Sequence, residues 1–208
     1  KILIIGEEKL KKQSSNLVTF FSLSSINFLK ELNLGDVINQ SSSVNEISCS
    51  KLENLKENHK FQIHFKDKKY ELGRVISNKI LNEKLDDEIN KNKNINVSRN
   101  INIQNCEFLK EENILILESG EKITTKLLII TEKKTNLIDQ NFKNNLIKKD
   151  LKQTSLVLDV KSRTKNHAYQ IFTKKGAIAY LPINENLASV IWSLDNSSDE
   201  LDYSQEDI

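Results

Sequence analysis

The sequence is poor in glycine and proline, with 5 Gly and 1 Pro among 208 residues, where average usage would give about 15 and about 10. Methionine is absent, and the cysteines are Cys49 and Cys106 alone. Two cysteines without a CxxC pair or a His at ligand spacing exclude a disulfide framework and the usual zinc spacing, so we expect two reduced thiols. The shortage of Gly, Pro and Met indicates either AT-rich codon usage or a sequence that is the ordered part of a longer chain.

Long apolar runs are also missing. No run approaches the roughly 18 residues that span a membrane, and the opening KILIIG continues into EEKLKK without a signal-peptide cleavage site. A composition of 38% hydrophobic and 29% charged residues predicts a soluble globular protein. We therefore expect a cytoplasmic location.

The charge is distributed unevenly along the chain. Residues 176–208 contain 7 acidic residues and no Lys or Arg, while residues 1–175 contain 31 basic and 22 acidic ones, a net charge of +9. Because the lysines are scattered among Asn and Glu rather than clustered in one stripe, we expect a solvated surface and no nucleic-acid partner.

Local catalytic motifs are absent from the sequence. The histidines at 59, 64 and 167 form no HxxxH pair, so a metal site is not predicted. There is no GxSxG nucleophile elbow and no P-loop lysine motif. Local motifs therefore identify no catalytic residue, and we interpret Phe172, Tyr180 and Trp192 as aromatic residues that pack within a sheet.

The chain opens with a pattern that is typical of a buried parallel strand, Ile2–Ile5 closed by Gly6. A strand that ends in Gly suggests a nucleotide-binding βα unit, whose next part would be GxGxxG at the start of a helix. Glu7 and Glu8 follow instead, so this fingerprint is absent. A second aliphatic run, Leu127–Ile130, predicts a neighbouring parallel strand of the same sheet.

Two amphipathic helices are predicted between these runs. The serine pair at 24–25 is expected to cap the first, and Gly35 to end or bend it; its apolar face carries Ile26, Leu29 and Leu32. Ser77 is expected to cap the second, over residues 78–91. Short strands are expected at residues 45–50, 61–65, 95–97, 101–103, 106–109 and 114–117.

The last third of the sequence has an antiparallel β character. Residues 132–152 are polar and form the expected crossing between two substructures. Apolar residues alternate with polar ones at 156–160, a strand is expected at 169–172, and residues 184–186 are expected to turn a hairpin. The acidic tail from residue 195 is expected to fray or to begin a helix.

Five segments, taken in order, carry a family resemblance: KILIIG, SLSSINFLKELNLGDVI, ELGRVISNKIL, ESGEKITTKLLIITEKK, and AYQIFTKKGAIAYLP followed by VIWS. They resemble segments of the FAD-dependent aromatic hydroxylases of ubiquinone biosynthesis, relatives of p-hydroxybenzoate hydroxylase. That family carries A-x-x-x-F-x-x-x-G-P-x-A-x-L-P before a strand that ends in V-W-S. Ala177 stands where the family usually has Pro. The resemblance covers nearly the whole chain.

The resemblance implies an α/β fold, with an incomplete FAD/NAD(P)-binding (Rossmann-like) sheet in residues 1–150 and part of an antiparallel β substrate-binding layer in residues 151–208. It implies FAD as the cofactor, with Gly6 as a cofactor-binding residue, and NAD(P)H as the co-substrate. The implied substrate is a polyprenylated aromatic ring that is hydroxylated in ubiquinone biosynthesis. A quinone-biosynthesis complex or a peripheral membrane contact is implied as a further partner. The implied substrate-binding residues are Gly176, Leu181 and Pro182.

Several positions depart from the family pattern. The glycine fingerprint is missing, Leu17 stands near the position of a flavin-contacting Arg, and Thr131-Glu132-Lys133 replaces the A-D-G turn. The later G-D-A-A-H segment does not occur. Two alternatives therefore stay open: a flavin-free paralogue that keeps the substrate sheet as a binding or scaffold module, and an interaction domain with only generic α/β patterning.

Overall fold

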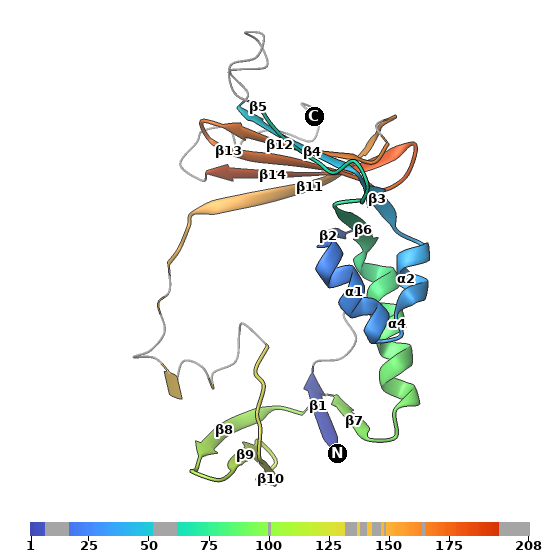
Figure 1. The fold of residues 1–208 in the computed structure, drawn as a ribbon. Helices are drawn as coiled ribbons and strands as arrows, with labels where there is room; N and C mark the ends of the chain where they lie inside the picture. The colour runs from blue at the N-terminus through green and yellow to red at the C-terminus, as the bar shows by residue number, and fades with distance from the viewer. Residues whose placement is uncertain are drawn as a thin grey trace. The chain divides into compact units, whose positions relative to one another are not determined.

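The structure is a computed structural model that describes residues 1–6, 17–51, 62–99, 101–131, 137, 141–142, 147, 149–163 and 165–195. It forms two compact units, each built from two stretches of chain: residues 1–12 with 92–150, and residues 13–91 with 151–208 (Figure 1). The sequence-based division placed a single boundary at residue 150. That division stays a prediction. In the structure, residues 46–51 pair with residues 167–172, and residues 13–91 group with residues 151–208.

The first unit contains a parallel pair of strands, β1 (Ile2–Gly6) and β7 (Ile95–Arg99), with Ile2 opposite Ile95. Three antiparallel strands follow, β8 (Ile103–Phe108), β9 (Asn113–Leu117) and β10 (Lys122–Thr125). The first of these merges the two short strands expected at 101–103 and 106–109. Gly120 lies in the turn between β9 and β10 with a φ of 84°, a value that glycine adopts without strain.

The expected strand at Leu127–Ile130 is wrong. These residues form no ladder, and the described partner of β1 is β7. Leu127 and Ile129 are 72% and 74% exposed, whereas Leu128 and Ile130 pack against the buried cluster of Cys106, Leu115 and Leu137. The run therefore contributes to the same core as Ile5 without entering the sheet, because a short apolar run specifies burial but not a pairing partner.

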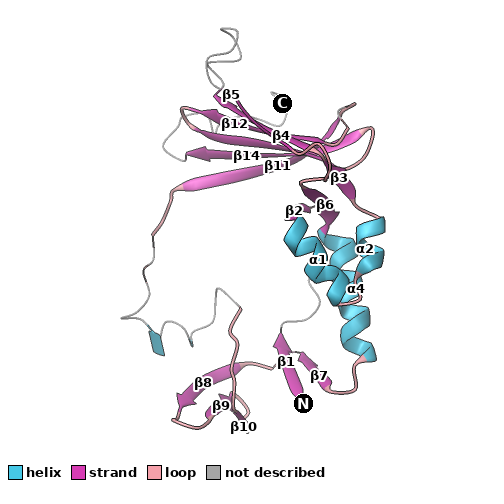
Figure 2. Ribbon diagram, viewed as in Figure 1, coloured by secondary structure: helices cyan, strands magenta, loops and turns pink. Residues whose placement is uncertain are grey.

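Among its described residues, the second unit has the helices α1 (Leu23–Glu31), α2 (Gly35–Asn39) and α4 (Asn78–Lys91), which lie beside β6 in Figure 2. The range predicted for α4 is confirmed. The N-cap of α1 is Ser22, whose side chain accepts from the backbone N–H of Ser25, so the cap predicted at 24–25 is wrong. Gly35 begins α2 rather than ending or bending α1. The core of this part contains Ile26, Leu29, Leu34, Val37, Ile38 and Ile76.

Leu32 does not belong to this core, although its spacing placed it on the apolar face. Its side chain is 45% exposed, because α1 ends at Glu31 and Leu32 is the C-cap with a ψ of 10°. Among the described residues, no helix is long and apolar enough to span a membrane.

Two sheets complete the second unit. A three-stranded sheet has the order β2-β6-β3, from β2 (Val18–Ser22), β6 (Gly73–Ser77) and β3 (Ser42–Val44). A six-stranded sheet has the order β11-β14-β13-β12-β4-β5 (Figure 1). Its strands are β4 (Glu46–Lys51), β5 (Gln62–Lys66), β11 (Gln153–Lys161), β12 (His167–Thr173), β13 (Gly176–Pro182) and β14 (Leu187–Asp195).

The six-stranded sheet confirms the predicted antiparallel layer, since only β4 and β12 pair in parallel. The hairpin expected at 184–186 joins β13 to β14. Together with the parallel β1–β7 pair, this sheet confirms the predicted fold class, an incomplete α/β fold with an antiparallel layer. His59, Phe61, the segment after Gly6, most of the crossing at 132–152 and the tail from residue 196 lie outside the described residues.

Candidate functional site

The three residues expected to bind substrate all lie on β13, which runs between β12 and β14. Gly176 begins the strand and Pro182 ends it, so six steps of about 3.3 Å place their backbones about 20 Å apart. Leu181 packs against the buried cluster that includes Val44 and Ala168. Pro182 is fully buried and lies beyond Tyr180, the last β13 residue that faces β12 in the ladder (Tyr169 opposite Tyr180).

Gly176 has a backbone reason to be glycine. Its φ is 153°, and a β-carbon there would lie 1.8 Å from the carbonyl oxygen of Ser193 on the neighbouring strand. A position of this kind excludes other residues whether or not a ligand binds. The substrate-binding roles of Gly176, Leu181 and Pro182 therefore stay predictions, and they do not form one compact site.

Gly6 ends β1, and a β-carbon there would meet no atom within 4 Å. That space suits the close approach of a ligand. In the sequence, Glu7 and Glu8 stand where the family has glycines. The residues after Gly6 lie outside the described part of the chain, so the cofactor-binding role of Gly6 stays a prediction.

A polar cluster occupies one face of the six-stranded sheet, where β5, β4 and β12 run side by side. The Ser48 hydroxyl lies 2.8 Å from His64 Nδ1 and 2.7 Å from His167 Nε2. His167 Nδ1 in turn lies 3.0 Å from the Tyr169 hydroxyl, and the two rings stack at 4.0 Å. We call these side chains, together with Glu46 and Lys66, the histidine cluster.

Glu46 is the negative charge of the histidine cluster. Lys66 Nζ lies 2.7 Å from its Oε2, while His64 Nδ1 and His167 Nε2 lie 3.4 and 3.8 Å from its Oε1. The hydrogen bond from Lys66 lowers the pKa of Glu46, with smaller contributions from the two imidazoles. The carboxylate therefore stays ionised at neutral pH.

Burial acts on the other members of the histidine cluster. Desolvation lowers the pKa of His167, against the attraction of Glu46, which raises it. Desolvation also raises the pKa of Tyr169, and the charge of Glu46 and the neighbouring Tyr180 raise it further. Both groups are therefore neutral at neutral pH, and the cluster can pass or store a proton between a hydroxyl and an imidazole.

The sequence did not bring His64 and His167 together, because 103 positions separate them and neither lies in a ligand motif. The strand register places both beside Ser48, through the β4–β5 pairing on one side and the β4–β12 pairing on the other. One sequence signal existed, since Glu46, Ser48 and Ser50 alternate with apolar residues in NEISCS and thus share a face. Within the described ranges, no group of three His, Cys, Asp or Glu side chains is arranged to hold a metal ion.

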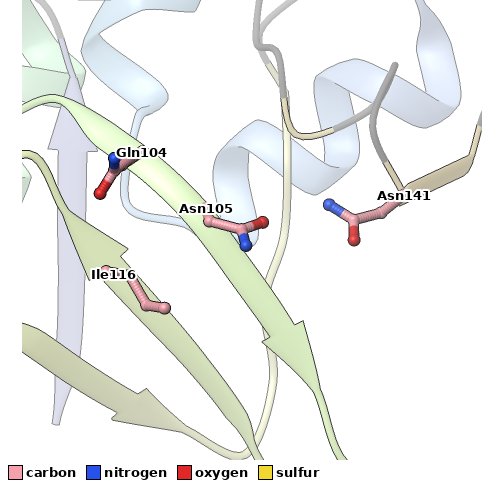
Figure 3. Close-up of a pocket in the computed structure, with 4 residues that line it drawn as sticks. All are labelled: Gln104, Asn105, Ile116 and Asn141. Carbon is pink, nitrogen blue, oxygen red and sulfur yellow. The ribbon is translucent and has the colours of Figure 1, made fainter.

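The first unit has an open hollow of about 550 Å³ next to β8. Figure 3 shows its lining, Gln104 and Asn105 from β8, Ile116 from β9, and Asn141. The β8–β9 register shifts between Ile103 and Asn105. Asn105 Oδ1 accepts from the N–H of Cys106, and Asn141 Nδ2 donates to the carbonyl of Leu137. The side-chain amides of Asn105 and Asn141 thus already hydrogen-bond within the protein, and no titratable side chain lines the hollow.

Comparison with known proteins gives one curated relative and several solved structures. No family model matches the chain. The chain is 26% identical over 193 residues to the ubiquinone biosynthesis monooxygenase COQ6, mitochondrial, of Caenorhabditis elegans. The match includes 86% of this chain and 41% of the relative, so the chain spans about two fifths of that relative's length.

The solved structures share the fold at low identity. PqsL of P. aeruginosa in complex with 2-aminobenzoylacetate has a TM-score of 0.70 at 9% identity, over 93% of this chain and 54% of its own. HpxO of Klebsiella pneumoniae complexed with FAD and uric acid has a TM-score of 0.65 at 9% identity, over 92% and 49%. A variant of 2-methyl-3-hydroxypyridine-5-carboxylic acid oxygenase has a TM-score of 0.63 at 13% identity, over 91% and 51%.

These findings agree with the order of motifs in the sequence and with the antiparallel layer in the structure. The chain has the fold of FAD-binding monooxygenases, and its resemblance to the FAD-dependent aromatic hydroxylases of ubiquinone biosynthesis is confirmed by the match to COQ6.

Proposed function

We propose that this chain forms the substrate-side part of an FAD-dependent monooxygenase that hydroxylates an aromatic polyprenyl ring in ubiquinone biosynthesis. The observation that carries the proposal is the match to COQ6 over 86% of the chain. The six-stranded sheet supports it, because it contains the segment AYQIFTKKGAIAYLP on which the resemblance is strongest.

In such an enzyme the flavin activates dioxygen and NAD(P)H reduces the flavin, while the protein orients the substrate ring. The part that this chain contributes is orientation. Its apolar strands β13 and β14 offer a rigid surface, since each pairs with a neighbour on both sides. A polyprenylated ring is largely apolar, so burial against such a surface is its main source of binding energy.

A flavin-free role is the second candidate, and one specific observation favours it. The family's phosphate-binding glycines are replaced by Glu7 and Glu8, and the A-D-G turn by Thr131-Glu132-Lys133. A chain with these changes keeps the substrate sheet while losing affinity for the cofactor. In that role it would bind the prenylated ring or act as a scaffold module in a quinone-biosynthesis complex.

An absorption spectrum of the purified chain, followed by titration with FAD, separates the two roles. Bound flavin at one equivalent per chain supports the monooxygenase and contradicts the flavin-free role. A colourless chain that does not bind added FAD supports the second role, provided that it binds 4-hydroxybenzoate carrying a short prenyl chain, followed by the fluorescence of Trp192. A chain that binds neither ligand contradicts the monooxygenase and the ring-binding form of the flavin-free role.

The cellular location of the chain is also a proposal. The COQ6 relative is mitochondrial, and the cytoplasmic location expected from this sequence stays a prediction. A peripheral membrane contact would give the chain access to a polyprenylated substrate, which partitions into lipid. Co-sedimentation with lipid vesicles measures that contact directly: recovery of the chain in the pellet supports it, and recovery in the supernatant contradicts it.

A further inference from the structure

The edge strand β5 carries its polar and its apolar side chains on opposite faces of the six-stranded sheet. His64 contacts Ser48 on the face of the histidine cluster. Successive side chains of a strand point to opposite faces, so Ile63 and Phe65 lie on the other face. They are 43% and 52% exposed, although a sheet with one solvated face ordinarily buries its apolar residues. Within the described part of the chain, the apolar side of β5 is therefore uncovered.

The strand register extends this apolar surface to β12. Ile63 lies opposite Cys49 of β4, and Cys49 lies opposite Gln170 of β12. Phe172 follows Gln170 by two residues and therefore shares its face, and it is 44% exposed. We call Ile63, Phe65 and Phe172 the β5 apolar patch. Among the described residues, none of these three packs against a buried cluster.

The face that carries the patch differs in polarity between its two edges. Leu181 of β13, one of the residues expected to bind substrate, lies on this face, because Ala179 two residues before it is opposite Gln170. At the β11 edge the same face carries Val157 next to Asp159. Covering a carboxylate with an apolar group is costly. An apolar ligand that begins near Leu181 is therefore favoured towards β5.

We propose that the β5 apolar patch binds the prenyl tail of the ring substrate. The inference rests on the proposed function and adds the path of the tail, which runs from Leu181 across β12 and β4 to β5. A prenyl chain has no hydrogen-bonding group, so its binding depends on the apolar area that it removes from water. The charged side chain beside the patch is Lys51, opposite Phe172, and a lysine can lay its aliphatic stem along an apolar surface while its ammonium stays in water.

The size of the patch agrees with this occupant. Phe65 lies opposite Ile47, Ile47 lies opposite Ala168, and Phe172 follows Ala168 by four residues. Two strand spacings and four residues give about 10 Å by about 13 Å, or about 130 Å². This area accommodates a short prenyl chain. It is far below the roughly 800 Å² that each partner buries in a standard protein interface, which argues against a second copy of the chain.

Equilibrium dialysis with 4-hydroxybenzoate that carries no, one, two or three prenyl units, in the presence of excess FAD, tests the proposal. In the unaltered chain we expect Kd to fall about hundredfold from one unit to three, the effect of about three to four buried CH₂ groups. In the double variant Ile63→Thr and Phe65→Thr, this gain should shrink to less than about tenfold. Kd for the unprenylated compound should be unchanged, because the ring does not reach the patch.

Two further variants make the test specific. Threonine is β-branched and suits a strand, so the substitutions preserve β5. Val157→Thr is the matched control, because Val157 lies on the same face with the same exposure of 43% but on β11 at the other edge; it should keep the full gain. If the double variant fails to fold, Phe172→Thr serves instead and should reduce the gain about threefold.

An undiminished gain in the double variant, or in Phe172→Thr, would overturn the proposal, as would an equal loss in Val157→Thr. Equal Kd values for the three prenylated compounds would overturn it too, while ring binding would stand. A chain that binds none of the four compounds contradicts ring binding itself, and the proposed function with it. Sedimentation velocity checks the other occupant: a dimer that dissociates in the double variant would assign the patch to a second copy and overturn the proposal.

Discussion

Replacing Gly176 with alanine tests whether this residue is fixed by the backbone or by a ligand. The added β-carbon would lie 1.8 Å from the Ser193 carbonyl oxygen and 2.8 Å from the Ser193 carbonyl carbon. Both are backbone atoms of β14, so no side-chain rotation relieves the contact. The two strands must separate at this end, where Gly176 pairs with Leu194 and Thr173.

The cost has two sources. Overpacking against fixed atoms typically costs about 1–3 kcal/mol, and a non-glycine residue held at a φ of 153° adds about 1–3 kcal/mol of strain. We expect the free energy of unfolding to fall by about 2–5 kcal/mol, because partial relaxation of the hairpin recovers some of the sum. With a denaturant slope of about 2 kcal/mol per molar urea, the midpoint should fall by about 1–2.5 M.

Urea unfolding followed by Trp192 fluorescence measures this effect, since Trp192 lies on β14 opposite Ile178 of β13. The matched control is Gly35→Ala: a β-carbon at Gly35 meets no atom within 4 Å, and alanine is favoured over glycine in a helix by about 1 kcal/mol. It should be neutral or stabilising. A Gly176→Ala variant that keeps the original midpoint but loses binding of the prenylated phenol would refute the backbone explanation and support the substrate-binding role.

Two further stability predictions concern the helices and their core. Ser22→Ala removes the side-chain acceptor for the N–H of Ser25 and should lower the free energy of unfolding by about 0.5–1 kcal/mol in thermal melts; an unchanged melting temperature would show that the cap contributes nothing. Ile76→Ala empties a site that is 1% exposed and should cost about 2–5 kcal/mol, whereas Leu32→Ala, at a site 45% exposed, should stay within about 0.5 kcal/mol. Equal costs for these two variants would contradict the observed core.

The helical and antiparallel elements were readable from the sequence because their signals are local. The range 78–91 carries a 3.6-residue apolar repeat and forms α4, and the alternation at 156–160 forms part of β11. Leu127–Ile130 shows the limit of such signals. Its aliphatic residues predicted a buried strand, yet only alternate side chains of the run pack against a core. Whether such a run also pairs depends on which edge of a neighbouring strand is available to it.

The contacts within the histidine cluster could not be predicted from local sequence patterns either. Nothing within a few residues of His64 or His167 indicates a partner for either. Their meeting at Ser48 depends on β4 lying between β5 and β12 in one register, and a shift of one residue would turn Ser48 to the other face.

The sequence by itself determined which segments form helices or strands, the antiparallel character of the late strands and the family resemblance. All three depend on residue patterns of short range. The tertiary structure alone decided that β4 and β5 complete the sheet of β11 to β14, that Gly176 faces a backbone carbonyl, and that two distant histidines share one serine. These depend on contacts between segments far apart in the chain, whose free energy comes from pairing and burial that no local pattern specifies.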